Sequence, residues 1–233
     1  MKRTILTAIL SLLAICMNAQ EQRKTISILG DSYSTFVGFI PKGNAIWYDL
    51  PVNPRNTDVS DVKQTWWWKT ISEGGYKLGV NDSYSGATIS YSGYDDADYS
   101  DRSFITRAER LGDLGNPDII LIFGGTNDSW AGTKVGNYVY EDFRKGDLYF
   151  YRPALAKLLQ TLQEHYPNVE LYFLLNSELR DDINESTKTI CRHYSVPCIE
   201  LKDIDKMAGH PSIKGMSSIS KQVLSVLDGK KKK

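Results

Sequence analysis

The chain has few of the residues on which several kinds of protein depend. It contains three cysteines and three histidines among 233 residues. That is too few for a disulfide framework, and the paired Cys/His spacing of a zinc site is missing. Lys plus Arg and Asp plus Glu each number 28, so the formal net charge is zero. A neutral chain has no general attraction for nucleic acid or anionic lipid, and we expect neither as a partner.

Long apolar runs are also scarce, and none is long enough to span a membrane. A run of about a dozen residues, Ile5–Cys16, follows two basic residues and precedes the small Ala19, which is typical of a signal peptide. We therefore predict a signal peptide over residues 1–19 and an exported protein, periplasmic or secreted. A lipoprotein anchored through Cys16 is the alternative, although Ile15 is large for the position before such a cysteine.

The remaining length suits one domain, which we place at residues 20–229. Lys230–Lys233 form a basic tail. Without the leader, Cys191 and Cys198 are the remaining cysteines. Their close spacing in an exported chain permits a disulfide, and two buried free thiols are an equal alternative.

Short apolar, β-rich runs alternate with runs of helical periodicity. The predicted strands are Thr25–Leu29, Tyr76–Val80, Asp118–Phe123, Val169–Leu175 and Val196–Leu201. The predicted helices are Asp61–Ser72, Tyr151–Tyr166, Ile183–Tyr194 and Ile213–Leu227. Such alternation predicts a parallel sheet of about five strands covered by helices on both faces, a three-layer α/β/α sandwich of the flavodoxin-like type. Functional sites in such sheets lie beyond the carboxyl ends of the strands.

The segment Gly30–Ser34 follows the first predicted strand and holds Ser32. A glycine permits a tight turn from strand to helix. A serine in that turn can attack through Oγ and offer its N–H to an oxyanion. An ordinary N-cap serine is the structural alternative.

Two further candidates follow other predicted strands. Gly86 lies after the second strand and can present a bare backbone N–H, although it also suits a plain turn. Asn127 lies after the third strand within Gly124–Asp128, where its amide can donate to a negatively charged oxygen. A turn-forming Asn-Asp pair is the alternative there.

His210 lies in a loop between Gly209 and Pro211, a setting typical of a functional side chain. The other two histidines, His165 and His193, fall on predicted amphipathic helices, where a packed or solvated role is expected. A candidate nucleophile needs a base, which favours His210.

These four segments, in this order, resemble the conserved blocks of the SGNH (GDSL-like) hydrolases, from Ile26 to about Val226. The runs Val62–Trp67 and Ser83–Thr88 are similar to exported Bacteroidetes members. The resemblance implies a serine esterase with Ser32 as nucleophile and His210 as base. It implies an oxyanion hole made of the Ser32 N–H, the Gly86 N–H and the Asn127 side chain, and no metal or organic cofactor.

One position departs from the family pattern. The family places an aspartate three residues before the histidine, where this chain has Met207. Either Asp205 or Asp203 reaches His210 by another path, or a backbone carbonyl orients the ring in a Ser-His dyad, or the protein is slow or inactive. Asp31 and Asp128 are expected to bond nearby backbone instead.

Aromatic residues gather in the long Pro/Gly/Asn-rich segment 36–61 and the region after it. We predict that the active-site wall includes members of one set: Trp47, Tyr48, Tyr84, Tyr91, Tyr94 and Trp130. Trp47, Tyr84 and Trp130 are the candidate substrate contacts, whereas Trp66–Trp68 are expected to lie mainly in the core. Many tyrosines and few exposed aliphatic residues favour a sugar-linked ester over a long lipid.

The sequence thus predicts a hydrolase of carboxylic esters, acting on a small-molecule or glycan ester such as a short acyl group on a carbohydrate. Two alternatives stay open. One is a glycan-binding protein without activity on a degenerate esterase fold, and the other is a lipase or thioesterase of the same mechanism.

Overall fold

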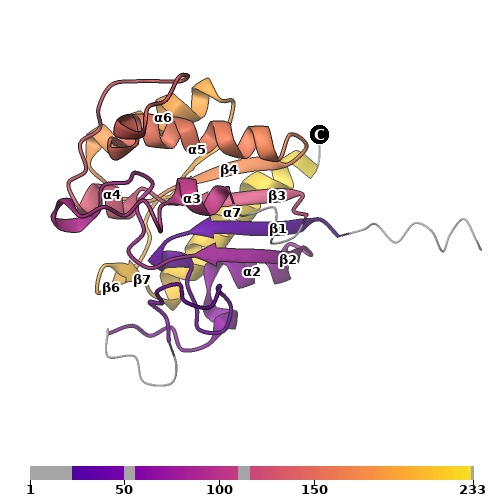
Figure 1. Cartoon of the computed structure of the whole chain (residues 1–233). Coiled ribbons are helices and arrows are strands. Elements are labelled where there is room, and N and C mark those ends of the chain that lie inside the picture. Colours follow the sequence, from indigo (N-terminus) through magenta and orange to yellow (C-terminus); the bar gives the residue numbers. More distant parts are fainter. Residues whose placement is uncertain (1–22, 50–55, 110–115, 232–233) are drawn as a thin grey trace, which may run out of the picture.

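The computed structural model describes residues 23–49, 56–109 and 116–231. Its centre is a parallel sheet of five strands in the order β2-β1-β3-β4-β5. The strands are β1 (Thr25–Gly30), β2 (Lys77–Ser83), β3 (Ile119–Phe123), β4 (Glu170–Leu175) and β5 (Cys198–Glu200). Figure 1 shows this sheet between two layers of helices. The expected flavodoxin-like α/β/α fold is confirmed.

The strand order reverses direction between β1 and β3. From β1 the chain adds β2 on one side and then β3, β4 and β5 on the other. At this reversal the connections leave toward opposite faces of the sheet, which opens a crevice beyond the carboxyl ends of the two strands. The turns after Gly30 and Phe123 therefore occupy the preferred site of the fold.

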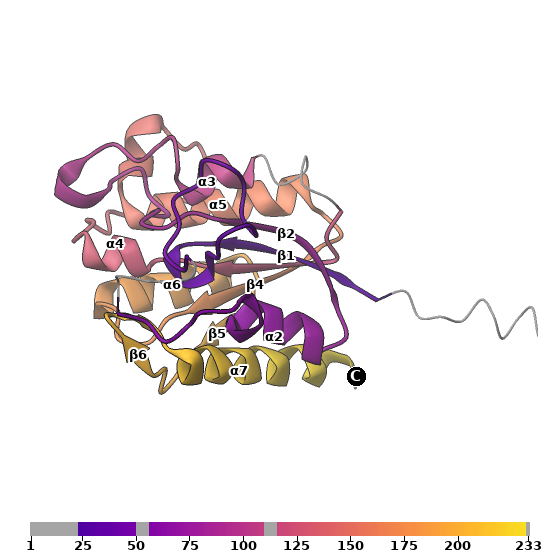
Figure 2. The same ribbon diagram turned by 90° about the horizontal axis from the view of Figure 1, so that it is seen from below.

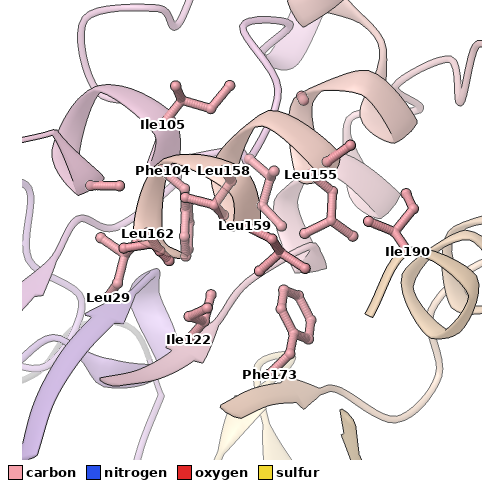
Figure 3. Packing of buried hydrophobic residues seen from close by; sticks show 14 of the residues in the cluster. Leu29, Phe104, Ile105, Ile122, Leu155, Leu158, Leu159, Leu162, Phe173 and Ile190 are labelled. Carbon is pink, nitrogen blue, oxygen red and sulfur yellow. The ribbon is translucent and has the colours of Figure 1, made fainter. Parts of the chain in front are cut away.

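One face of the sheet is covered by α3 (Phe104–Ala108), α5 (Tyr151–His165) and α6 (Asp181–His193). Strand residues such as Leu29, Ile122 and Phe173 pack on Leu155, Leu158 and Leu159 of α5 in a fully buried cluster (Figure 3). Alternate residues of each strand point to opposite faces, so the same strands supply a second core on the other side.

The other face is covered by α2 (Trp66–Glu73) and α7 (Ile213–Lys231), which lie together beneath the sheet in Figure 2. Their core contains Ile28, Leu121 and Tyr172 from the strands, with Trp66 and Met216 from the helices. Because β3 faces both layers, all five of its residues are buried, which explains its uninterrupted apolar sequence.

Short elements gather at the carboxyl ends of the strands. They are α4 (Thr126–Trp130) and a two-stranded antiparallel ribbon of β6 (Lys206–Met207) and β7 (His210–Pro211). Figures 1 and 2 both place α4 and β6 at the same end of the sheet. These segments and α3 are each too short to show a periodic pattern in the sequence, so none of them was predicted.

The predicted strands and long helices are all present, with changes of boundary. The largest change is in the predicted helix Asp61–Ser72, where a 3-10 helix, Val62–Gln64, forms first and α2 begins only at Trp66. β2 begins one residue later than expected and continues to Ser83, so Asn81 and Asp82 lie inside the strand instead of after it. Trp66 and Trp67 are fully buried, as expected of core residues. Cys191 is buried and Cys198 half-buried, and both are free thiols.

The predicted signal peptide, residues 1–19, lies outside the described residues and stays a prediction. The proposed basic tail overlaps the end of α7, which continues to Lys231. Within the described part of the chain, no helix combines the length and the apolar character needed to cross a membrane.

Candidate active site

Ser32 occupies the first turn after β1. Asp31 caps a short 3-10 helix, Ser32–Ser34, by accepting the backbone N–H of Tyr33 at 3.0 Å. A glycine is needed at position 30, because a Cβ there would lie only 2.5 Å from the hydroxyl of Ser83. The local sequence therefore places Ser32 at the carboxyl end of a central strand, as a residue that is 2% exposed.

His210 is presented by the β6–β7 ribbon. Its Nε2 lies 2.8 Å from Oγ of Ser32, although 177 residues separate the two in the chain. Its Nδ1 lies 3.1 Å from the carbonyl oxygen of Ala208. A carbonyl can only accept, so Nδ1 carries the proton and Nε2 presents its lone pair to the Ser32 hydroxyl. This is the tautomer that a general base requires.

Asp205 immediately precedes the ribbon, and its contacts are with Ser212. Its carboxylate accepts the hydroxyl of Ser212, and its backbone carbonyl accepts the Ser212 N–H at 3.0 Å. The Ser212 hydroxyl in turn accepts the N–H of Gly215 at 3.1 Å. Asp205 therefore secures the start of α7. Asp203, the other carboxylate considered, is exposed and has a positive φ of 54°.

Two buried tyrosines hold the histidine loop by its backbone. The hydroxyl of Tyr33 donates to the carbonyl of Gly209 at 2.6 Å, and that of Tyr48 donates to the carbonyl of Pro211 at 2.9 Å. Both tyrosines are fully buried. The peptide group that precedes His210 and the one that follows Pro211 are thus anchored, which restricts the position of the ring relative to Ser32.

Two tryptophans line the same histidine. The indole of Trp47 stacks on the imidazole at a centroid distance of 3.4 Å and an angle of 8°. Trp130 meets the ring edge-on at 5.7 Å and is 45% exposed. The structure places Trp47 and Trp130 at the site, whereas the ring of Tyr84 lies beneath the guanidinium of Arg102 at 5.8 Å.

Backbone contacts link the three segments that carry the proposed oxyanion donors. The turn around Gly86 is joined to β1 because Tyr84 donates its N–H to the Gly30 carbonyl at 3.1 Å. The amide of Asn127 donates from Nδ2 to the carbonyl of Ala87 at 2.9 Å. Among the described residues, the N–H groups of Ser32 and Gly86 donate to no other group. Gly86 has a φ of 84°, which favours glycine.

Buried carboxyl groups hold the segments that carry the proposed oxyanion donors. Asp128 accepts the N–H groups of Ile89 and Ser90 at 2.7 and 3.0 Å, which ties the chain after Gly86 to α4. Burial raises the pKa of Asp128. Burial also raises the pKa of Asp31 to about 7, although the Tyr33 N–H and the Arg107 charge both lower it. The expected backbone-bonding of Asp31 and Asp128 is confirmed.

Sequence reasoning missed part of this arrangement. The anchoring hydroxyls of Tyr33 and Tyr48 gave no signal, because nothing in a sequence tells which carbonyl a distant phenol will reach. The buried Arg107 was also missed. It donates from Nε to the carbonyl of Arg102 at 3.0 Å and from a terminal nitrogen to that of Asp82, beneath the strand ends.

A serine and a histidine in contact at the switch point of a doubly wound α/β sheet define a serine–histidine site. The model of the GDSL-like lipase/acylhydrolase family matches residues 24–227. The chain therefore belongs to the GDSL-like lipase/acylhydrolase family.

Solved structures agree with this assignment. A candidate GDSL-like lipase of Bacteroides ovatus is 57% identical, with a TM-score of 0.85 over 90% of this chain and 100% of that one. A counterpart from Bacteroides uniformis is 50% identical, with a TM-score of 0.86 over 90% and 97%. A family two carbohydrate esterase of Clostridium thermocellum shares the fold at 15% identity, with a TM-score of 0.60 over 89% and 64%. The comparison with curated proteins gave no significant match.

Proposed function

We propose that this protein is a serine ester hydrolase with Ser32 as the nucleophile and His210 as the general base. One observation carries the proposal: Oγ of Ser32 lies 2.8 Å from Nε2 of His210, and Nδ1 of the same ring is hydrogen-bonded to the carbonyl of Ala208. A serine hydroxyl is a weak nucleophile alone and becomes a strong one when an adjacent base accepts its proton. Family membership supports the same chemistry.

The proposed reaction follows from the positions of the protons. As Oγ of Ser32 bonds to the ester carbonyl carbon, its proton moves to Nε2 of His210. The carbonyl oxygen becomes negative and accepts hydrogen bonds from the Ser32 N–H, the Gly86 N–H and Nδ2 of Asn127. The imidazolium returns the proton to the leaving alcohol, and a water activated by the same histidine then releases the acid.

In this proposal the imidazole is oriented without a carboxylate. The carbonyl of Ala208 holds the Nδ1 proton at 3.1 Å, and Trp47 covers one face of the ring. A cation over an aromatic face is stabilised by about 0.5–2 kcal/mol, so the stacked indole favours the imidazolium that forms during the reaction. A Ser-His dyad therefore agrees better with the contacts than a triad through Asp205.

We further propose an acylated carbohydrate as the substrate class and export as the setting. Trp130, 45% exposed beside His210, offers a flat apolar face of the kind that sugar rings stack on. Proteins that share this fold include carbohydrate esterases. Export rests on the composition of residues 1–19.

The first test is hydrolysis of p-nitrophenyl acetate by the wild type, Ser32→Ala and His210→Ala. Each variant should lose about 1,000-fold or more in kcat, because the pair acts as a unit. His165→Ala, at an exposed histidine on α5, is the matched control and should keep full activity. A fluorophosphonate should phosphonylate Oγ of Ser32 with loss of fluoride, which adds the mass of the phosphonyl group to the wild type, and leave Ser32→Ala unmodified.

Equal rates for the wild type and Ser32→Ala would refute the proposed activity. The glycan-binding alternative would then be favoured, and calorimetric titration with neutral oligosaccharides would test it. In that case Trp130→Ala should abolish binding, whereas His210→Ala should leave it intact.

A further inference from the structure

Tyr94 contacts the amide of Asn127 on the side opposite to the one proposed to face the oxyanion. Its hydroxyl donates to Oδ1 of Asn127 at 2.8 Å. Nδ2 of the same amide donates one of its two hydrogens to the carbonyl of Ala87 at 2.9 Å. The carbonyl end of the amide is thereby fixed, and one N–H remains for a substrate oxygen.

The loop that carries Tyr94 is tightly closed at its base. The N–H of Gly93 donates to the carbonyl of Ala97 at 2.7 Å, and the N–H of Ala97 donates to that of Tyr94 at 3.1 Å. The next two residues, Asp95 and Asp96, have left-handed φ values of 55° and 56°. Two successive non-glycine residues in this region are costly, and such strain collects at functional sites.

Packing inside the loop also helps to hold the ring of Tyr94 near Asn127. The ring of Tyr99 lies so close to Gly93 that a Cβ there would come within 2.3 Å of it. Tyr99 also contacts the ring of Tyr94 at a centroid distance of 6.4 Å. The absence of a side chain at Gly93 therefore lets Tyr99 support the ring that reaches Asn127.

We infer that Tyr94 is a positioning residue of the proposed esterase: its hydroxyl fixes Asn127 so that the remaining Nδ2 hydrogen points at the oxyanion. This inference rests on the proposed function and deepens it. An asparagine amide is nearly symmetric in shape, so only hydrogen bonds select which end faces the substrate. Donation to Oδ1 also polarises the amide and strengthens its N–H as a donor.

Tyr94 keeps its proton across the pH range in which an esterase works. Burial, together with the charge of Asp31, raises the pKa of Tyr94 to about 12. The phenol is therefore a constant donor to Asn127, and the contact is not lost in mildly alkaline assays.

The test compares Tyr94→Phe with Tyr149→Phe in the full-length mature protein. Tyr149 is the matched control, because its hydroxyl bonds the same loop through Asp98 at 2.9 Å without reaching Asn127. Tyr94→Phe should lower kcat for p-nitrophenyl acetate about tenfold with little change in KM. The loss is smaller than the 100- to 1,000-fold typical of a deleted oxyanion donor. Tyr149→Phe should match the wild type.

Dependence on Asn127 separates positioning from general loosening of the loop. In the Asn127→Ala background, Tyr94→Phe should cause no further loss of kcat, because the group it orients is gone. Equal, independent losses in both backgrounds would overturn the inference. So would a Tyr149→Phe variant as slow as Tyr94→Phe.

A spectroscopic readout keeps the inference testable apart from activity. The side-chain NH₂ signals of Asn127 in a ¹H–¹⁵N spectrum can be assigned from their loss in Asn127→Ala. They should shift in Tyr94→Phe and stay in place in Tyr149→Phe. Unshifted signals would disprove the hydrogen bond even in an active enzyme. Shifted signals together with a wild type no faster than Ser32→Ala would instead reject the proposed function, and the positioning role of Tyr94 with it.

Discussion

The Nδ1 atom of His210 lies against the carbonyl of Ala208, on a ribbon whose turn is made by two residues with positive φ. Ala208 has a φ of 47° and Gly209 one of 75°. This backbone conformation turns the Ala208 carbonyl back toward the imidazole two residues later. The sequence showed that the usual aspartate position holds Met207 and left three possibilities, but it could not select one. The choice depends on a turn conformation set by single φ angles.

Replacing Asp205 tests directly whether the carbonyl of Ala208 or a carboxylate orients His210. Asp205→Asn should keep kcat within about threefold of the wild type, because its carboxylate is engaged with Ser212. An aspartate that orients a catalytic histidine contributes about 10,000-fold. Activity on p-nitrophenyl acetate, with Asp203→Asn in parallel, provides the measurement. A loss of several hundredfold in Asp205→Asn alone would establish a triad.

The buried Asp31 gives a pH-dependent prediction about stability. Its pKa is about 7 in the fold, against 3.8 for an ordinary aspartate. Between these values the unfolded chain has released the proton that the folded chain retains. The stability that protonated Asp31 supports is therefore complete below about pH 3.8 and is lost as the pH rises through about 7.

Asp31→Asn is neutral at every pH and should avoid this loss. Relative to the wild type, its free energy of unfolding should rise between pH 4 and 7, by up to about 4 kcal/mol, and then level off. Urea unfolding at several pH values measures the difference. Asp98→Asn should behave oppositely and at lower pH, because hydrogen bonds from Ser100 lower the pKa of Asp98 below 3.8. Its free energy of unfolding should fall relative to the wild type as the pH rises to about 4, and the difference should stay constant above that pH. Parallel stability curves for Asp31→Asn and the wild type would refute the prediction.

Among the helices and strands, the sequence predicts best those that are stabilised by burial of apolar residues. β3 and β4 are apolar runs buried on both faces, and they begin within one residue of their predicted starts. β2 was predicted too short, because its second half is polar and buried. There Asn81 donates to the carbonyl of Ser34 at 2.8 Å, and Asp82 accepts from Asn44 at 2.9 Å. Such partners lie far away in the sequence and leave no periodic pattern.

The β6–β7 ribbon depends on such distant partners for its position. Tyr48→Phe should lower the free energy of unfolding by about 1 kcal/mol, the usual contribution of one hydrogen bond. It should also lower kcat several-fold, because the carbonyl of Pro211 loses its anchor and His210 can shift relative to Ser32.

Tyr172→Phe is the matched control for this variant. Tyr172 is equally buried, and its hydroxyl donates to Glu170 at 2.8 Å near the start of β4, at the opposite end of the sheet. A comparable loss of stability with unchanged kcat is expected. Should both variants slow catalysis alike, the anchoring role of Tyr48 would be refuted.

For the molecule as a whole, the topology places the candidate chemistry at one edge of the sheet. Ser32 follows β1, Asn127 follows β3, and the histidine ribbon lies at the same end in Figures 1 and 2. The sequence could predict this convergence, because parallel strands that alternate with helices bring their carboxyl ends together. It named a set of aromatic residues for the site but could not tell which of them would reach it, since that depends on the path of long loops. Trp47 lies at the site and stacks on His210, whereas Tyr84 packs against Arg102.

The exposed indole of Trp130 should decide between a sugar ester and a lipid ester. Trp130→Ala should raise KM for an acetylated xylo-oligosaccharide about tenfold, equal to about 1.4 kcal/mol of binding, and leave KM for p-nitrophenyl acetate nearly unchanged. Tyr138→Ala removes a similarly exposed aromatic ring that packs on Arg152, and it should affect the KM of neither substrate.

The wild type should also hydrolyse p-nitrophenyl acetate faster than p-nitrophenyl palmitate, because the described wall beside His210 is aromatic. A preference for palmitate, with Trp130→Ala slowing only that ester, would favour the lipase alternative instead.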